Sequence, residues 1–168
     1  MVSNELLRRF PFFAGLSQEH ISTLAKISDE VNTETDHYFF REDDKLDCVH
    51  LILEGSVGIV FRLPKRNIRH KISEQFEREL KSEDVIVSTL GLGDVFGWSG
   101  IVPPFKATAG AKSLTKCRVI AIQSNELLEL FEDDYRFGYL MTQKAAQVIR
   151  DRLHTLRIET LAFTMEAP

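Results

Sequence analysis

The stretch from Gly93 to Ala109 constrains the fold of this chain more than any other. It reads Gly-Asp-Val-Phe-Gly-Trp-Ser-Gly-Ile-Val, followed by Pro-Pro-Phe-Lys-Ala-Thr-Ala. A glycine turn, a short apolar strand, a glycine-flanked helical turn and a strand of small residues follow one another. Such an order turns several backbone N–H groups toward one concave surface, which is how proteins build a cradle for an anion. The stretch therefore predicts a binding site that is made largely of backbone and lies among strands.

The N-terminal thirty residues are predicted to form two short helices. Asn4 to Phe10 is amphipathic, and Ser17 is a good N-cap for a second helix. Beyond them the hydrophobic period changes to that of strands, and about eight strands are expected before Ser124. After a weaker run that starts at 31, they are predicted at 37–40, 49–53, 57–63, 85–90, 94–96, 107–113 and 117–122. Because Glu54-Gly55-Ser56 separates two of these runs, a hairpin is predicted there.

A charged segment from Pro64 to Asp84 interrupts the strands. Its apolar residues recur at a spacing of four, which suits an amphipathic helix better than a strand. These residues are Ile68, Ile72, Phe76 and Leu80. We expect an insertion on the domain surface, which is either a solvated loop with one packed face or a helix that docks a partner.

A long helix is predicted at the C-terminal end. Ser124 is expected to cap a short helix, and Asp133 or Asp134 to cap a long one that runs to about Phe163. At ~1.5 Å per residue, about 30 residues give roughly 45 Å, which is longer than the rest of the domain needs. Since such a helix usually packs on a copy of itself or on another domain, a homodimer is predicted. The expected interface residues are Phe137, Met141, Ala145, Val148, Leu153 and Leu156.

Together these elements predict one domain, 1–168, that is mainly β with flanking α. The predicted fold class is a double-stranded β-helix, or jelly-roll barrel, with short N-terminal helices and a long C-terminal helix. The N-terminal helices fall in 1–30, the barrel with its insertion 64–84 in 31–123, and the C-terminal helices in 124–168. Because only Thr164 to Pro168 follow the long helix, no DNA-binding domain is expected.

Charge and composition narrow the expected partners and location. The net charge of −4 argues against a free-standing nucleic-acid binder, because phosphate contacts need clustered Lys and Arg. The charged start, Met1 to Arg9, lacks the apolar run of a signal peptide, and no apolar run approaches the length that crosses a bilayer. Cys48 and Cys117 lie in apolar strand-like runs, where buried thiols are common. A cytoplasmic protein without membrane or direct nucleic-acid contact is expected.

Several motifs resemble the cyclic nucleotide-binding domains of the catabolite-activator/FNR regulator family. They are the opening helix and loop, a charged turn, a strand–glycine–strand motif, the approach to the helical turn and the strand that closes the barrel. The matching segments are 7–17, Phe-Arg-Glu-Asp-Asp at 40–44, His-Leu-Ile-Leu-Glu-Gly-Ser-Val at 50–57, Gly-Asp-Val-Phe-Gly at 93–97 and Cys-Arg-Val-Ile-Ala-Ile at 117–122. The resemblance covers nearly the whole chain. It implies a non-enzymatic regulatory domain whose phosphate-binding cassette, the stretch from 93 to 109, holds a cyclic nucleotide.

Two side chains with which the family holds the nucleotide differ in this chain. In the family, a glutamate accepts a hydrogen bond from the ribose 2′-hydroxyl, and an arginine pairs with the cyclic phosphate. Trp98 and Ala107 occupy these positions, although a shift of one residue would bring Lys106 to the arginine position. Thr108 takes the small hydroxyl position. Asp43 replaces a turn glycine, and Asp tolerates left-handed backbone angles better than most residues.

These departures predict a sensor or interaction domain with weak or lost binding of cyclic AMP and cyclic GMP. The candidate ligand-binding residues are Gly97, Trp98, Ser99, Gly100, Lys106, Ala107 and Thr108. No resident cofactor is expected; the ligand would be a cyclic nucleotide, another small anion, or none. Trp98 either caps the barrel or offers a stacking platform. The output would pass through the C-terminal helix to a dimer or to a separate effector protein.

Two alternatives to this function remain open. The first is a genuine cyclic nucleotide-binding module that uses Lys106, Thr108 and the backbone amides of the cassette. The second is a metal enzyme, because jelly rolls also host cupin chemistry, which needs clustered histidine and carboxylate ligands. The histidines at 20, 37, 50, 70 and 154 are scattered and include no His-x-His pair, so no metal site is expected. His50 is expected to pack in the core or at its rim.

Overall fold

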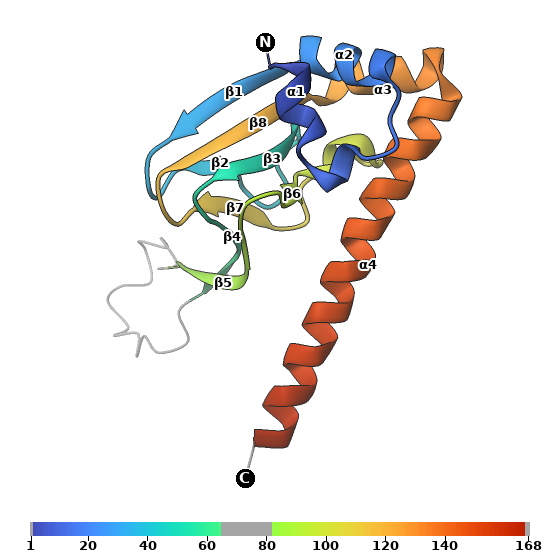
Figure 1. Ribbon diagram of the computed structural model, residues 1–168. Coiled ribbons are helices and arrows are strands. Elements are labelled where there is room, and N and C mark those ends of the chain that lie inside the picture. The colour runs from blue at the N-terminus through green and yellow to red at the C-terminus, as the bar shows by residue number, and fades with distance from the viewer. Residues whose placement is uncertain (1, 65–81, 167–168) are drawn as a thin grey trace. The chain divides into compact units, whose positions relative to one another are not determined.

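The computed structural model describes residues 2–64 and 82–166 (Figure 1). The helix expected within 64–84 therefore falls almost wholly outside the described residues. The helical elements are α1 Asn4–Arg8, η1 Pro11–Phe13, α2 Gln18–Lys26, η3 Trp98–Ile101, α3 Ser124–Asp133 and α4 Tyr135–Glu166, of which η1 and η3 are 3₁₀ turns. The strands are β1 Ser28–Thr33, β2 Tyr38–Phe40, β3 Cys48–Glu54, β4 Val57–Pro64, β5 Ser82–Leu90, β6 Val95–Phe96, β7 Gly110–Ser113 and β8 Cys117–Gln123.

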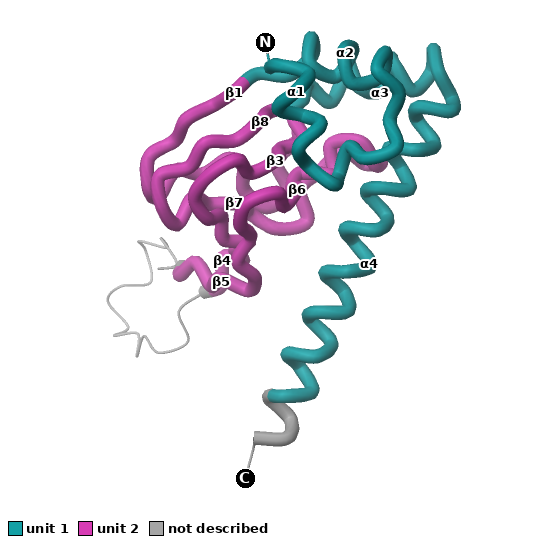
Figure 2. Tube along the Cα trace, in the orientation of Figure 1, with its two compact units in different colours: residues 1–29, 122–168 teal, residues 30–121 magenta. Residues whose placement is uncertain are grey.

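The chain divides into two compact units (Figure 2). Residues 1–29 and 122–168 form one unit, which contains the α-helices, and residues 30–121 form the other, which contains most of the strands. Within the described residues, no helix combines the length and the apolar character that a membrane crossing requires. The organisation as one domain stays a prediction.

The strands form two four-stranded sheets that share one core. One sheet has the order β1-β8-β3-β6 and the other the order β2-β7-β4-β5. Buried side chains from both sheets pack together, namely Ile52, Val57, Leu90, Phe96, Ala111, Cys117 and Val119. Burying this apolar surface between two sheets is the main stabilising term of such a fold. The structure confirms the expected fold class, a mainly β jelly roll with flanking helices.

The hairpin predicted at Glu54-Gly55-Ser56 is wrong. β3 belongs to one sheet and β4 to the other, so these residues carry the chain between sheets. Gly55 has a φ of +89°, and a Cβ there would lie 2.3 Å from the carbonyl oxygen of Lys116. The Ser56 N–H donates to the Thr115 hydroxyl at 3.0 Å, which fastens this corner to the loop before β8. The glycine correctly indicates a turn, but strand spacing alone cannot distinguish a hairpin from a corner between sheets.

Two of the three expected helix caps form. The Ser17 hydroxyl accepts a hydrogen bond from the His20 N–H at 3.1 Å, and Asp134 Oδ1 accepts one from the Phe137 N–H at 3.0 Å. Ser124 does not cap α3, contrary to the prediction. It is the first residue of the helix, and its hydroxyl is buried without a hydrogen-bond partner among the described residues. The cause is that β8 runs directly into α3. The extended N-cap position therefore falls on Gln123, and Ser124 already lies within the helix.

The apolar stripe expected to form an interface on α4 has two different halves. Phe137, Met141 and Ala145 are buried within the chain; the Phe137 ring lies 4.7 Å from that of His20. Further along, Val148 is half-buried, while Leu153 and Leu156 are 46% and 42% exposed. The earlier half therefore belongs to this chain's own packing, and the later half is the part that a partner could cover.

Candidate functional site

The glycine-flanked turn of the cassette follows β6. Gly97 has a φ of +76°, and the Gly100 N–H donates to the Gly97 carbonyl at 2.9 Å, which closes the 3₁₀ turn η3. A Cβ on Gly97 would lie 2.8 Å from the Cys48 carbonyl oxygen and 3.4 Å from His50 Nδ1, so this position needs glycine for both its backbone angle and its space. The first N–H groups of a helical turn have no partner within the turn, and they are therefore suited to an anion.

The second part of the cassette, Lys106 to Thr108, is held by the turn that follows β2. The Ala107 N–H donates to the Asp44 carbonyl at 2.8 Å, and the Ala107 carbonyl accepts from the Asp43 N–H at 2.9 Å. Asp43 has a φ of +67°, so an aspartate does occupy a left-handed turn position here. Ala107 is 3% exposed, whereas the neighbouring Lys106 and Thr108 are exposed. The methyl group at 107 thus belongs to the interior, and the ammonium at 106 faces solvent.

A strained turn joins the two parts. The Phe105 N–H donates to the Val102 carbonyl at 2.9 Å, and Phe105 has a φ of +63°. A left-handed backbone costs a residue other than glycine about 1–2 kcal/mol, so the surrounding structure must hold Phe105 in place. Sequence reasoning missed this feature, because an aromatic residue carries no signal for positive φ.

An aromatic cluster packs beside Gly97. The His50 ring stacks on Phe96 with 4.8 Å between centroids and an interplanar angle of 12°, and the Phe39 ring meets His50 edge-on at 5.3 Å. Burial, and secondarily the nearby His37, lowers the pKa of His50 from 6.5 to about 4. His50 is therefore neutral at pH 7, and its Nδ1 has no hydrogen-bond partner among the described residues. The packed position expected for His50 is confirmed.

The remaining cassette residues differ in exposure. Ser99 and Gly100 are buried, whereas Trp98 is half-buried. A half-buried indole is compatible with either expected role, as a cap on the barrel or as a stacking platform. Both roles of Trp98 stay predictions.

The sequence profile of the cyclic nucleotide-binding domain matches residues 30–134, which is more than half of the chain. The chain belongs to the cyclic nucleotide-binding domain family. A CRP-like cAMP-activated global transcriptional regulator of Mycobacterium tuberculosis is 24% identical over 130 residues, which cover 77% of this chain and 51% of the relative. The chain thus spans about half the length of the curated relatives it matches.

Solved structures agree with this assignment. A Geobacter metallireducens protein described as a candidate cyclic nucleotide-binding protein is 28% identical, with a TM-score of 0.75 and coverage of 92% of this chain and 100% of that chain. The catabolite activator protein of Thermus thermophilus is 18% identical, with a TM-score of 0.62 and coverage of 92% and 63%; it shares the fold. The resemblance stated from the motifs is confirmed, and the family is a regulatory one.

Proposed function

We propose that this domain is a non-catalytic regulatory module whose affinity for cyclic AMP and cyclic GMP is weak or lost. The observation that carries the proposal is the placement of Ala107. Its backbone is fixed by two hydrogen bonds to the turn after β2, and its methyl group is buried, while Lys106 points to solvent. This supports the alignment in which Ala107, rather than Lys106, takes the place of the family's phosphate-binding arginine.

The size of the effect follows from the two missing side chains. A charge-assisted hydrogen bond contributes ~1.5–3 kcal/mol to the binding free energy, and an arginine often binds a phosphate through two such bonds. Counting one such bond for the arginine and one for the ribose-binding glutamate, the loss of both removes roughly 3–6 kcal/mol, which corresponds to two to four decades of affinity. A lysine at the neighbouring position is a flexible point charge and restores only part of this.

Calorimetric titration of the natural chain with cyclic AMP and cyclic GMP tests the proposal directly. Submicromolar affinity for either nucleotide would contradict it. The variant Trp98→Glu with Ala107→Arg is expected to gain about a hundredfold in affinity or more, because it restores both groups. Trp98→Glu with Lys106→Arg is the matched control, since it adds the same groups with the arginine facing solvent. Circular dichroism of each variant shows whether it retains the native fold.

The proposed output is a change in how α4 packs against a second copy of the chain or an effector protein. The exposed later half of its apolar stripe supports this role, because Leu153 and Leu156 offer an apolar surface to a partner. Sedimentation of the natural chain is expected to show a dimer that Leu153→Glu weakens. His154→Glu, on the adjacent exposed position of α4, is the control. A strict monomer at high concentration would remove homodimerisation from the proposal.

A further inference from the structure

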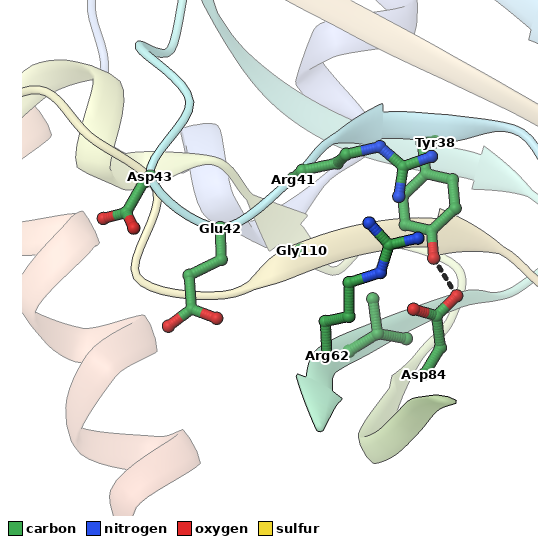
Figure 3. A pocket seen from close by; sticks show the side chains of 8 residues that line it. Tyr38, Arg41, Glu42, Asp43, Arg62, Asp84 and Gly110 are labelled. Atoms are coloured by element: carbon green, nitrogen blue, oxygen red, sulfur yellow. Dashed lines mark hydrogen bonds between the residues drawn. The ribbon is translucent and has the colours of Figure 1, made fainter. Parts of the chain in front are cut away.

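A cavity of about 230 Å³ with several charged lining residues lies on the face of the β2-β7-β4-β5 sheet that points away from the core (Figure 3). Val57 and Ile59 of β4 pack on the core side, so the alternate residues Val60 and Arg62 lie on the other face. Val60 pairs with Gly110 and Arg62 with Asp84, and all four residues line the cavity. None of the candidate ligand-binding residues of the cassette lines the cavity, although Asp43, which does, is hydrogen-bonded through its backbone to Ala107 of the cassette.

Two guanidinium groups meet in this cavity. Arg41, which follows β2, lies over the Tyr38 ring with its Cζ 3.7 Å from the ring centroid. Figure 3 shows the Arg62 side chain directed to the same place from β4. Within residues 2–64 and 82–166, neither guanidinium forms an ion pair with a carboxylate. Arg41 does form a side-chain hydrogen bond with Tyr38, but no carboxylate among these residues neutralises either positive charge, so both charges are available to a ligand.

The acidic residue beside the two arginines is already engaged. Tyr38 donates its hydroxyl proton to Asp84 Oδ2, and Lys112 Nζ lies 4.0 Å from the same oxygen. Burial and the hydrogen bond to Asp84 raise the pKa of Tyr38, so the phenol stays protonated and continues to donate. The other carboxylates on the cavity, Glu42 and Asp43, lie on its opposite side in Figure 3. The two guanidinium groups thus lie between Asp84, which Tyr38 and Lys112 engage, and the carboxylates of Glu42 and Asp43.

We propose that this cavity binds a small phosphate monoester, with the phosphoryl group between Arg41 and Arg62 and hydroxyl groups of the organic part facing Glu42. The planar guanidinium fork matches the oxygens of a phosphate, and one fork is held in position by stacking on Tyr38. Carboxylates accept hydrogen bonds from hydroxyl groups. The cavity volume is many times the ~10–15 Å³ that one water molecule needs, which leaves room for a phosphoryl group with a small sugar. This site is independent of the function proposed for the cassette.

Calorimetric titration of the full chain with ribose 5-phosphate and with inorganic phosphate, at constant ionic strength, tests the proposal. Arg41→Gln and Arg62→Gln are each expected to weaken both interactions about tenfold or more. Glu42→Gln is expected to weaken only the binding of ribose 5-phosphate, because inorganic phosphate carries no ribose. Lys26→Gln, which removes an exposed cation at the end of α2, is the matched control and is expected to change neither affinity more than about twofold.

Each contrary result has a distinct meaning. Absence of binding by the natural chain overturns the proposal, as does equal weakening in the arginine variants and in Lys26→Gln, which would show only general attraction of anions. Weakening by Lys106→Gln, with none in either arginine variant, would place the phosphate at the cassette and would also overturn the proposal. If Arg41→Gln disturbs folding through its contact with Tyr38, Arg62→Gln still decides the outcome. Cyclic nucleotide affinity is measured separately, so a failure here leaves the function proposed for the cassette unaffected.

Discussion

Replacing Gly55 with alanine tests the corner that carries the chain from one sheet to the other. The substitution has two separate costs. At a φ of +89° the backbone is left-handed, which costs a residue with a Cβ about 1–2 kcal/mol. The new Cβ would also lie 2.3 Å from the Lys116 carbonyl oxygen and 2.8 Å from Cys117 Sγ, and overpacking of this kind costs about 1–3 kcal/mol more. Gly55→Ala is therefore expected to lower the free energy of unfolding by about 2–5 kcal/mol.

Alanine substitutions at two other glycines measure the backbone cost and the packing cost separately. Gly15 has a φ of +81° and nothing within 4 Å of an added Cβ, so Gly15→Ala carries the backbone cost alone. Gly91 has open space and no positive φ, and Gly91→Ala is expected to stabilise the chain by about 0.4–1 kcal/mol through the unfolded state. Urea unfolding followed by circular dichroism gives the three free energies. Equal destabilisation by Gly55→Ala and Gly15→Ala would refute the close approach to β8.

Two further predictions concern His50 and Gly138. Because the pKa of His50 is about 4 in the folded chain against an ordinary 6.5, the unfolded chain binds a proton in that range that the folded chain does not. The contribution of His50 to the free energy of unfolding is therefore fully present above pH 6.5 and decreases by up to about 3 kcal/mol as the pH drops toward 4. Urea unfolding at a series of pH values is expected to show a smaller decrease for His50→Phe than for the natural chain. An alanine in a helix interior is usually about 1 kcal/mol better than glycine, but a Cβ on Gly138 would lie 2.9 Å from Phe131 Cβ. Gly138→Ala is thus expected to lower the melting temperature, and to lower it less in a Phe131→Gly background, which removes that Cβ. A rise with Phe131 in place would contradict the packing of α3 on α4.

Local signals in the sequence predicted most of the elements. Side-chain caps such as Ser17 and Asp134 act within one helical turn, so residue type and spacing are sufficient to find them. The backbone conformation of the cassette was predicted for a similar reason. Gly97 and Asp43 adopt the left-handed angles that their residue types favour, and the family motifs fall on the elements expected of them.

The features that were missed depend on residues far apart in the chain. Gly55 meets Lys116 and Cys117 only after the two sheets have formed, so a pattern confined to residues 54–56 cannot reveal the corner. Arg41 and Arg62 come together because β7 lies between β2 and β4, and nothing near either residue in sequence shows this order. The left-handed Phe105 is imposed by its surroundings against its own preference.

The half-buried indole of Trp98 offers a direct spectroscopic report on ligand binding at the cassette. Trp98 is the single tryptophan of the chain, so its fluorescence comes from this one turn and needs no label. A solute that enters beside the ring changes the polarity around it and shifts the emission, while a solute held on the outer face of the other sheet leaves the spectrum as it was. One emission titration thus assigns each ligand to its location.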